Sequence, residues 1–150
     1  MFPDFSQAEK FERVGQIWND LCLDPIGFAN NVFLAERDTA DKNYCLAYMM
    51  RESRSLPADY DIEKLVSLYL SFCSIETTCQ ALSVVAATLA NGGLNPFTGK
   101  RIFSERTVRN CLSLMASCGM YDGSGMFQLH IGIPAKSGVS GKPPPPRKNN

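Results

Sequence analysis

The stretch that decides the fold class, residues 117–141, reads SCGMYDGSGMFQLHIGIPAKSGVSG. It begins where a helix is expected to end, because Gly119 follows an apolar helical stripe. In residues 126–133, one set of side chains alternates with a second, apolar set, and this period of two is typical of a strand. The apolar set is Phe127, Leu129, Ile131 and Ile133. Pro134 ends that strand, and residues 137–141 are expected to form a second one. We therefore predict a short antiparallel β portion near residues 126–141.

The composition indicates one folded domain. The chain has 150 residues, of which 45% are hydrophobic, and this is enough to form a core. Its 15 basic and 15 acidic residues cancel and form no run of one sign, so we expect no nucleic-acid partner. The longest apolar run, residues 81–90, is about half of what a bilayer requires, and we expect no membrane span.

The cysteines and the single histidine do not form the pattern of a metal site. All six cysteines lie in periodic apolar segments, and we interpret them as reduced thiols in the core. Cys73 and Cys79 lack a close second pair, and His130 is the only histidine, so we predict no metal. In the expected strand, His130 is interpreted as a residue with a local hydrogen-bond partner rather than as a base.

The rest of the chain shows helical periodicity. Ser6 and Glu9 fit a capping box at the start of the first helix, and Ser104 is expected to cap the last long one. Residues 30–53 are helical in one piece or in two, with a break near residues 38–41. Two apolar helices, residues 62–73 and 77–90, are expected to be buried on nearly every side, with Asp59 or Asp61 capping the first.

Three polar residues in these helices are candidates for a site. Glu36 and Asn43 lie seven residues apart, which places both on one face if the helix is continuous. The alternative is an ordinary solvated helix surface. Tyr69 is expected in the core with its hydroxyl bonded to a neighbour.

The triplet Lys136-Ser137-Gly138 is the most suggestive motif of the chain. A Lys-Ser/Thr-Gly triplet on a strand is one of three sequence boxes of the penicillin-recognising serine acyl-transfer fold. The same three residues also occur in ordinary turns. The triplet alone therefore leaves a β-lactamase or penicillin-binding relative as one hypothesis, although no S-D-N box is present.

Four segments resemble the catalytic domain of the animal phosphate-activated glutaminases of kidney and liver type. They are LAERDTADKN at 34–43, LYLSFCSIETTC at 68–79, SVVAATLANGG at 83–93 and the long segment 108–141. The resemblance implies the α/β serine β-lactamase-like (DD-peptidase-like) fold, of which this chain is mostly helical, and hydrolysis of L-glutamine to L-glutamate and ammonia. It also implies a partial catalytic domain over residues 1–141, followed by a disordered proline-rich tail at 142–150.

The resemblance assigns substrate-binding roles to several positions. Glu36 resembles the acidic residue that pairs with the substrate α-ammonium group, and Asn43 resembles the amide that holds the α-carboxylate. Tyr69 resembles a tyrosine that lines the same pocket. A zwitterionic ligand needs such groups because buried ions are stable only when they are paired and hydrogen-bonded.

The resemblance also assigns roles near the reacting bond. Tyr121 resembles a catalytic and substrate-binding tyrosine that transfers a proton to the leaving ammonia. Val139 resembles the residue whose backbone N–H forms half of the oxyanion hole. The triplet residues Lys136, Ser137 and Gly138 are expected to support the pocket, with Lys136 shaping its electrostatics.

The chain departs from the family pattern in the nucleophile. In this fold the nucleophile is the serine of an S-x-x-K box, and no serine of the chain has a lysine three positions later. We therefore expect a fragment that lacks the S-x-x-K segment and the C-terminal strands and is inactive alone. The alternative is a non-catalytic short isoform that associates with full-length glutaminase subunits and modulates them.

The resemblance further implies a homo-oligomer or association with full-length glutaminase, L-glutamine and L-glutamate as ligands, and no cofactor apart from phosphate as an activator. It implies a mitochondrial location, although residues 1–4 show no arginine-rich presequence.

Overall fold

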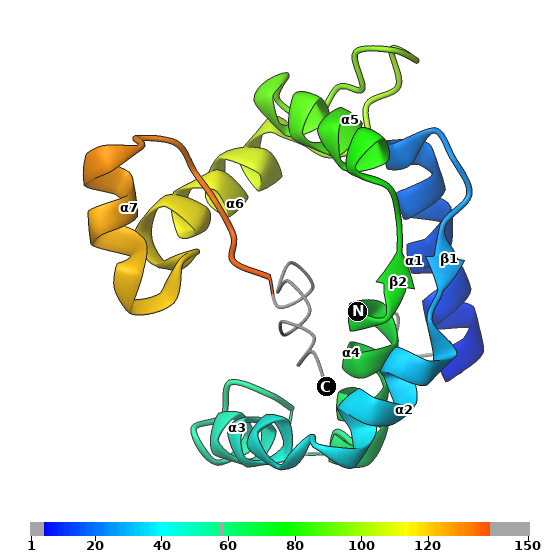
Figure 1. Ribbon diagram of the computed structural model, residues 1–150. Helices are drawn as coiled ribbons and strands as arrows, with labels where there is room; N and C mark the ends of the chain where they lie inside the picture. Colours follow the sequence, from blue (N-terminus) through cyan, green and yellow to red (C-terminus); the bar gives the residue numbers. More distant parts are fainter. Residues whose placement is uncertain (1–4, 58, 139–150) are drawn as a thin grey trace, which may run out of the picture.

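The computed structural model describes residues 5–57 and 59–138, and most of them are helical. Figure 1 shows the helices arranged as a curved, open chain of elements. In chain order the elements are α1 (Gln7–Cys22), β1 (Gly27–Phe28), α2 (Asn30–Asp38), α3 (Asp41–Glu52), α4 (Ile62–Cys73), β2 (Ile75–Glu76), α5 (Cys79–Ala90), α6 (Glu105–Cys118), the 3-10 turn η1 (Tyr121–Gly123) and α7 (Ser124–His130).

Side-chain caps set the starts of the long helices. Ser6 and Glu9 form the predicted capping box, in which each side chain bonds to the backbone amide of the other residue. The Asp61 carboxylate accepts a hydrogen bond from the Lys64 amide at 3.1 Å, and Ser104 caps α6 in the same way. These caps confirm the helix starts predicted from the sequence.

The helical region after residue 30 is broken. α2 ends at Asp38 and α3 begins at Asp41, and the Thr39 hydroxyl donates to the Ala35 carbonyl oxygen at 3.0 Å. Such bonding competes with helix continuation. The expectation that a seven-residue spacing places Glu36 and Asn43 on one helix face therefore does not apply.

The β portion was predicted in the wrong place. A two-stranded antiparallel sheet is present, but it pairs Gly27 with Glu76 and Phe28 with Ile75. Residues 124–130 form α7, and the described residues from Ile131 to Gly138 contain no strand. The backbone groups of a strand need hydrogen-bond partners on a neighbouring strand, whereas those of a helix bond within the helix itself. Alternating side chains do not supply a neighbouring strand.

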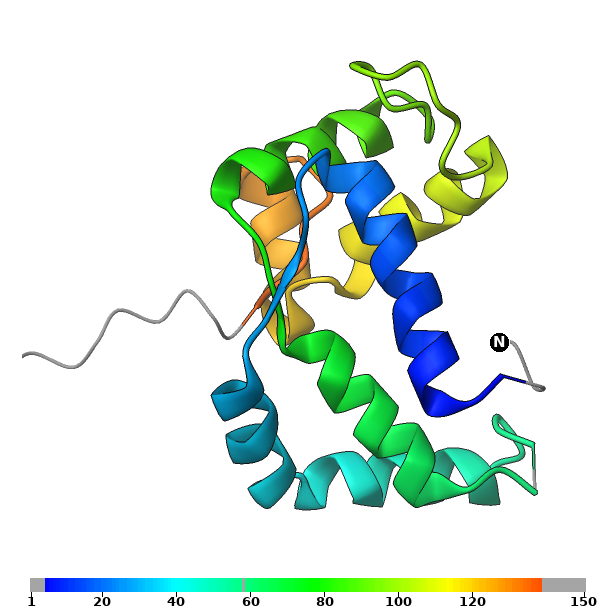
Figure 2. The same cartoon turned by 90° about the vertical axis from the view of Figure 1, so that its right-hand side faces the viewer.

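Two hydrophobic cores lie at either end of this small sheet. One contains Ala40, Ala47, Ile62, Val66 and Leu70 from α3, α4 and the α2–α3 connection. The other contains Leu21, Cys22 and Ala81 from α1 and α5. Figure 2 shows β1 and β2 side by side, connecting the helices of the two cores.

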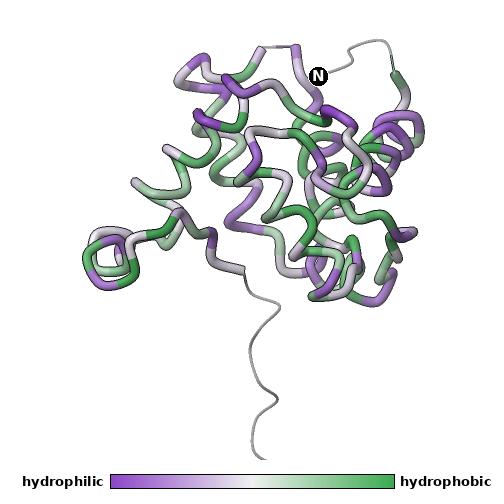
Figure 3. The backbone as a smooth tube through the Cα atoms, turned by 90° about the horizontal axis from the view of Figure 1, so that it is seen from above, coloured by the Kyte–Doolittle hydropathy of each residue, from purple (hydrophilic) through white to green (hydrophobic). Residues whose placement is uncertain are grey.

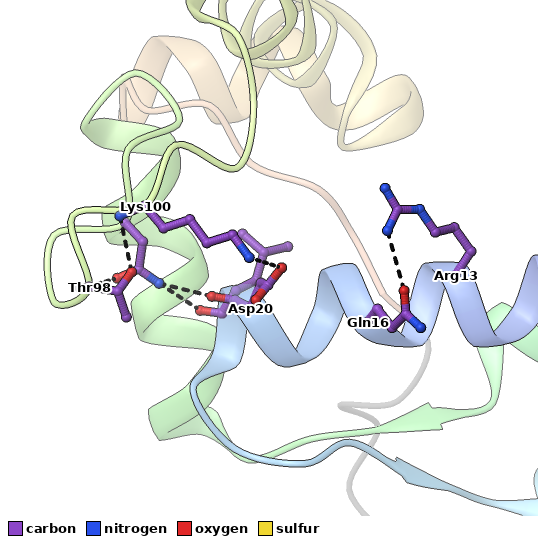
Figure 4. Close-up of polar contacts among 7 residues, drawn as sticks. Arg13, Gln16, Asp20, Thr98 and Lys100 are labelled. Atoms are coloured by element: carbon purple, nitrogen blue, oxygen red, sulfur yellow. Dashed lines mark hydrogen bonds and ion pairs between the residues drawn. The ribbon is translucent and has the colours of Figure 1, made fainter.

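The loop between α5 and α6 is fixed to the end of α1 by a buried amide. Asn95 is completely buried, and its Nδ2 donates to the carbonyl oxygens of Asp20 and Leu21. On the surface beside it, Lys100 forms an ion pair with Asp20 at 2.6 Å (Figure 4). The loop therefore holds the start of α6 in a defined position relative to α1.

The cysteines are free, as expected, but only Cys22 is buried and the other five are exposed. The interpretation as core thiols was wrong for those five, because their helices are less enclosed than apolar periodicity suggested. Leu82 of α5, for example, is exposed. Within the described part of the chain, none of the helices combines the length and apolar character that crossing a bilayer demands.

The arm formed by α6 and α7 is the least enclosed part of the structure. α7 packs against α6 and η1, and Figure 3 shows it at the edge of the molecule. Several large apolar side chains of this arm and of the segment after it are exposed: Leu114, Met126, Leu129, Ile131 and Ile133. Within the described part of the chain, the apolar side of this arm is therefore largely uncovered.

Candidate functional site

The predicted site residues come from four different elements. Glu36 lies on α2, Asn43 on α3, Tyr69 on α4 and Tyr121 in η1. Glu36 and Asn43 are partly buried, whereas 52% of Tyr69 and 77% of Tyr121 is exposed. Tyr69 is therefore not the core residue expected from its apolar surroundings.

Asn43 and Tyr69 border the same concavity. This cavity has a volume of about 300 Å³ between α3 and α4, and its remaining lining is apolar. A polar amide and a phenol at the rim of an apolar cavity are the kind of groups that orient a small ligand. The break between α2 and α3 allows Asn43 to face α4.

The electrostatics of Tyr69 connect it with Glu36 and Tyr121. The pKa of the Tyr69 phenol is raised above its usual value. The causes are first a side-chain hydrogen bond and an electrostatic interaction with Cys73, and then burial. The charges of Tyr121 and Glu36 raise this pKa further. Both groups therefore lie within electrostatic reach of Tyr69, although they belong to separate elements.

Lys136 lies next to Tyr121. Its ammonium nitrogen lies 5.0 Å from the centroid of the Tyr121 ring, a distance that permits a cation–π interaction. Lys136 Nζ also donates to the carbonyl oxygen of Ser137 at 2.8 Å. Gly138 is exposed next to them, and Val139, the predicted oxyanion-hole residue, lies outside the described residues, as does the tail at 142–150.

Gly119 brings this triplet segment to the end of α6. The Ser137 amide donates to the Gly119 carbonyl oxygen at 2.9 Å, and a Cβ on residue 119 would overlap the carbonyl oxygens of Ala135 and Met115. Only glycine permits this approach of two backbone segments. Sequence reasoning used Gly119 as a helix stop and missed its contact with Ala135.

Sequence reasoning also missed Cys73 and Ser124. Cys73 lies one helical turn after Tyr69 and is the first cause of the raised pKa of that phenol, and the i, i+4 spacing was the available signal. Ser124 contacts the backbone around Tyr121, and its signal was the turn-forming run Asp122-Gly123-Ser124.

Other features are separate from these residues. A larger concavity of about 600 Å³ lies between the end of α5 and α6 and includes Glu105 and Arg109, but none of the predicted site residues lines it. Among residues 5–57 and 59–138, no group of three or more His, Cys, Asp and Glu side chains is arranged to hold a metal ion.

A family model described as Glutaminase matches residues 1–142. The chain belongs to the glutaminase family. It is 60% identical to the putative glutaminase 3 of Caenorhabditis elegans over 116 residues. The matched region is 77% of this chain and 20% of the worm protein. It is 48% identical to the mitochondrial liver isoform of glutaminase of Rattus norvegicus over 139 residues. The matched region is 92% of this chain and 23% of the rat protein.

Solved structures give the same result for the fold. A Bacillus glutaminase crystallised in the presence of 4.3 M NaCl matches 93% of this chain with a TM-score of 0.84 and 31% identity, and 46% of that structure is covered. This member of the family therefore has part of the β-lactamase-like fold, as predicted. It spans about a fifth of the worm and rat relatives and less than half of the solved structure. The family match favours the glutaminase family over the penicillin-binding hypothesis.

Proposed function

We propose that this chain provides part of the substrate site of a glutaminase that hydrolyses L-glutamine to L-glutamate and ammonia. The observation that carries this proposal is the cavity that Asn43 and Tyr69 share, within a chain that belongs to the family. Lys136 lies over the Tyr121 ring, and the charges of Glu36 and Tyr121 act on the Tyr69 phenol.

The proposed roles follow from the chemistry of glutamine. The Glu36 carboxylate pairs with the α-ammonium group, Asn43 donates to the α-carboxylate, and Tyr69 contributes a phenol to the same cavity. A charged group that loses water requires a charged or hydrogen-bonding partner. The three side chains thus provide an anion and neutral polar groups for a zwitterion.

The second set of roles concerns the amide that is cleaved. Tyr121 transfers a proton to the departing ammonia, and the Val139 amide donates to the oxyanion of the tetrahedral intermediate. Lys136 places a positive charge beside Tyr121, with Ser137 and Gly138 supporting the segment. No metal or other cofactor enters these steps.

We further propose that the isolated chain binds glutamine without hydrolysing it. A serine and the lysine that activates it act as a unit, and the loss of either removes most of the catalysis. The sequence has no S-x-x-K box, so the nucleophile has to come from another glutaminase segment. The exposed apolar side chains of the α6–α7 arm favour association with such a segment.

Binding and hydrolysis are tested separately on the 150-residue chain. Titration with L-glutamine, followed by calorimetry, should show binding that Glu36→Gln weakens by roughly 10- to 100-fold, because the ammonium loses a charged partner. Glu52→Gln, an exposed change at the end of α3, serves as the matched control and should have no effect. Equal affinities for the two variants would contradict the role of Glu36.

Hydrolysis is measured as ammonia release by the same preparation. We expect none above the rate in buffer, and a clear release would refute the proposal that the chain is inactive alone. Mixing with rat liver-type glutaminase, followed by size-exclusion chromatography, tests association. A mitochondrial location, proposed from the names of the rat and mouse relatives, is tested by fractionation of cells that express the protein.

A further inference from the structure

Tyr121 has a backbone conformation that aromatic residues seldom adopt. Its φ angle is 51°, in the left-handed region where a side chain crowds its own backbone. Such a conformation persists only where the surrounding structure holds it, and residues of this kind cluster at active sites. The turn around Tyr121 therefore requires a group that stabilises it.

Ser124 is in the position to provide that stabilisation. Its hydroxyl accepts a hydrogen bond from the Met120 amide at 3.0 Å and donates one to the Tyr121 carbonyl oxygen at 2.6 Å. The residue is 5% exposed, so a missing partner would leave a buried polar group unsatisfied. One hydroxyl thus connects the residue before Tyr121 with the carbonyl group of Tyr121 itself.

An ordinary helix-capping role does not explain these bonds. A serine that caps a helix accepts from an amide two or three residues later in the chain, whereas the Ser124 hydroxyl faces back toward residues 120 and 121. The N-cap of α7 is Gly123, and no side chain caps this helix. The bonds of Ser124 are therefore directed at the turn that contains Tyr121.

The direction of the Tyr121 side chain depends on this turn. The side chain is largely exposed, so surrounding packing constrains it little, and the backbone conformation limits which rotamers, and thus which directions, the ring can adopt. In the conformation present, the ring lies beneath the Lys136 ammonium group. A turn with a different φ at residue 121 would move the ring away from Lys136.

We propose that Ser124 is a positioning residue, whose hydroxyl fixes the left-handed turn that directs the Tyr121 phenol toward the amide of glutamine. This inference rests on the role proposed above for Tyr121 in glutamine hydrolysis. Ser124 itself touches no substrate and acts through Tyr121.

The test is an NMR measurement of the Lys136 side chain in the full 150-residue chain. The ring current of Tyr121 should shift the Lys136 ε-methylene signal upfield, and Tyr121→Leu defines the signal without the ring. Ser124→Ala should lose most of the shift. Ser117→Ala removes a hydroxyl of α6 that bonds to Leu114 and should keep the shift. Retention of the full shift in Ser124→Ala would overturn the proposal.

A second pair of variants separates positioning from loss of folding. Thr and Val have nearly the same shape, so Ser124→Thr and Ser124→Val differ mainly in the hydroxyl. Far-UV circular dichroism checks that both are folded. The Thr variant should keep the Lys136 shift and the Val variant should lose it, and equal shifts in the two folded variants would overturn the proposal.

Glutamine affinity gives the functional readout. Ser124→Ala should weaken binding roughly 2- to 10-fold, as expected for a lost hydrogen bond, and Ser117→Ala should not. Unchanged affinity in a variant that has lost the Lys136 shift would overturn the functional part of the inference. The Lys136 signal is read without ligand, so a chain that binds no glutamine would refute the proposed function and leave the positioning test intact.

Discussion

The side-chain amide nitrogen of Asn95 lies 3.1 Å from the carbonyl oxygen of Asp20, in the last turn of α1. Its amide oxygen accepts hydrogen bonds from the Phe97 and Thr98 backbone amides. A single buried side chain thus satisfies backbone groups of two segments that lie about 75 residues apart in sequence. The helix end and the loop are consequently expected to unfold together.

Asn95→Ala should lower the free energy of unfolding by about 2–4 kcal/mol, because it leaves buried backbone groups without partners. The measurement is urea denaturation followed by circular dichroism. Lys100→Met removes the neighbouring surface ion pair with Asp20 and should cost less than about 1 kcal/mol. Similar losses in the two variants would contradict the dominant role of the buried amide.

Gly119→Ala should destabilise the protein by about 1–3 kcal/mol, because the added methyl group overlaps backbone oxygens. The NMR signals of Lys136 and Ser137 should move as the two segments separate. Gly125→Ala is the control, since a Cβ there meets nothing within 4 Å, and alanine should stabilise α7 slightly. Thermal unfolding that ranks the two variants in the opposite order would be inconsistent with this contact.

Acid should weaken the starts of α1 and α4. The pKa of Glu9 is lowered by its hydrogen bonds with Ser6, and that of Asp61 by its hydrogen bonds with Lys64. For a carboxyl whose folded pKa is depressed, the stabilisation is present above the unfolded pKa and is lost as the pH falls through the folded pKa. The melting temperature should therefore fall below about pH 4, and the fall should be smaller in Asp61→Asn and Glu9→Gln.

The pKa of Tyr69 should change when the residues that raise it are replaced. Because the Cys73 hydrogen bond is the first cause of the raised pKa, Cys73→Ala should lower the pKa of Tyr69 more than Glu36→Gln does. Phenolate absorbance, taken as the difference from a Tyr69→Phe variant, measures this pKa. Cys118→Ala, a change at another exposed thiol, should leave it unchanged. An unchanged Tyr69 pKa in Cys73→Ala would contradict a hydrogen bond between the thiol and the phenol.

Local signals in the sequence were sufficient for the helix starts. Ser6, Asp61 and Ser104 cap helices where their residue types predict it, because a capping bond involves only neighbouring residues. The alternation over residues 126–133 was misleading, since a strand also requires a partner that local sequence does not reveal. Here Gly132, with a φ of 75°, follows a short helix instead of continuing a strand.

The grouping of site residues came from the family resemblance and not from spacing. Glu36 and Asn43 lie on separate helices, so the two-turn argument does not explain their placement. The position of Tyr121 relative to Tyr69 depends on the route of the chain through α5 and α6, which no short-range pattern encodes. The contacts of Gly119 with Ala135 likewise depend on a return of the chain after α7.

The two hydrophobic cores are joined by the β1–β2 ladder and also by the packing of α1 on α4, where the Phe11 and Phe72 rings stack. Glu36 and Tyr69 belong to helices of the α2–α4 half, whereas Tyr121 follows α6, which is connected to the α1–α5 half. The distance between these groups therefore depends on how α1 packs against α4. A change that loosens this packing should speed amide exchange in both halves and weaken the fit between the protein and the amino acid.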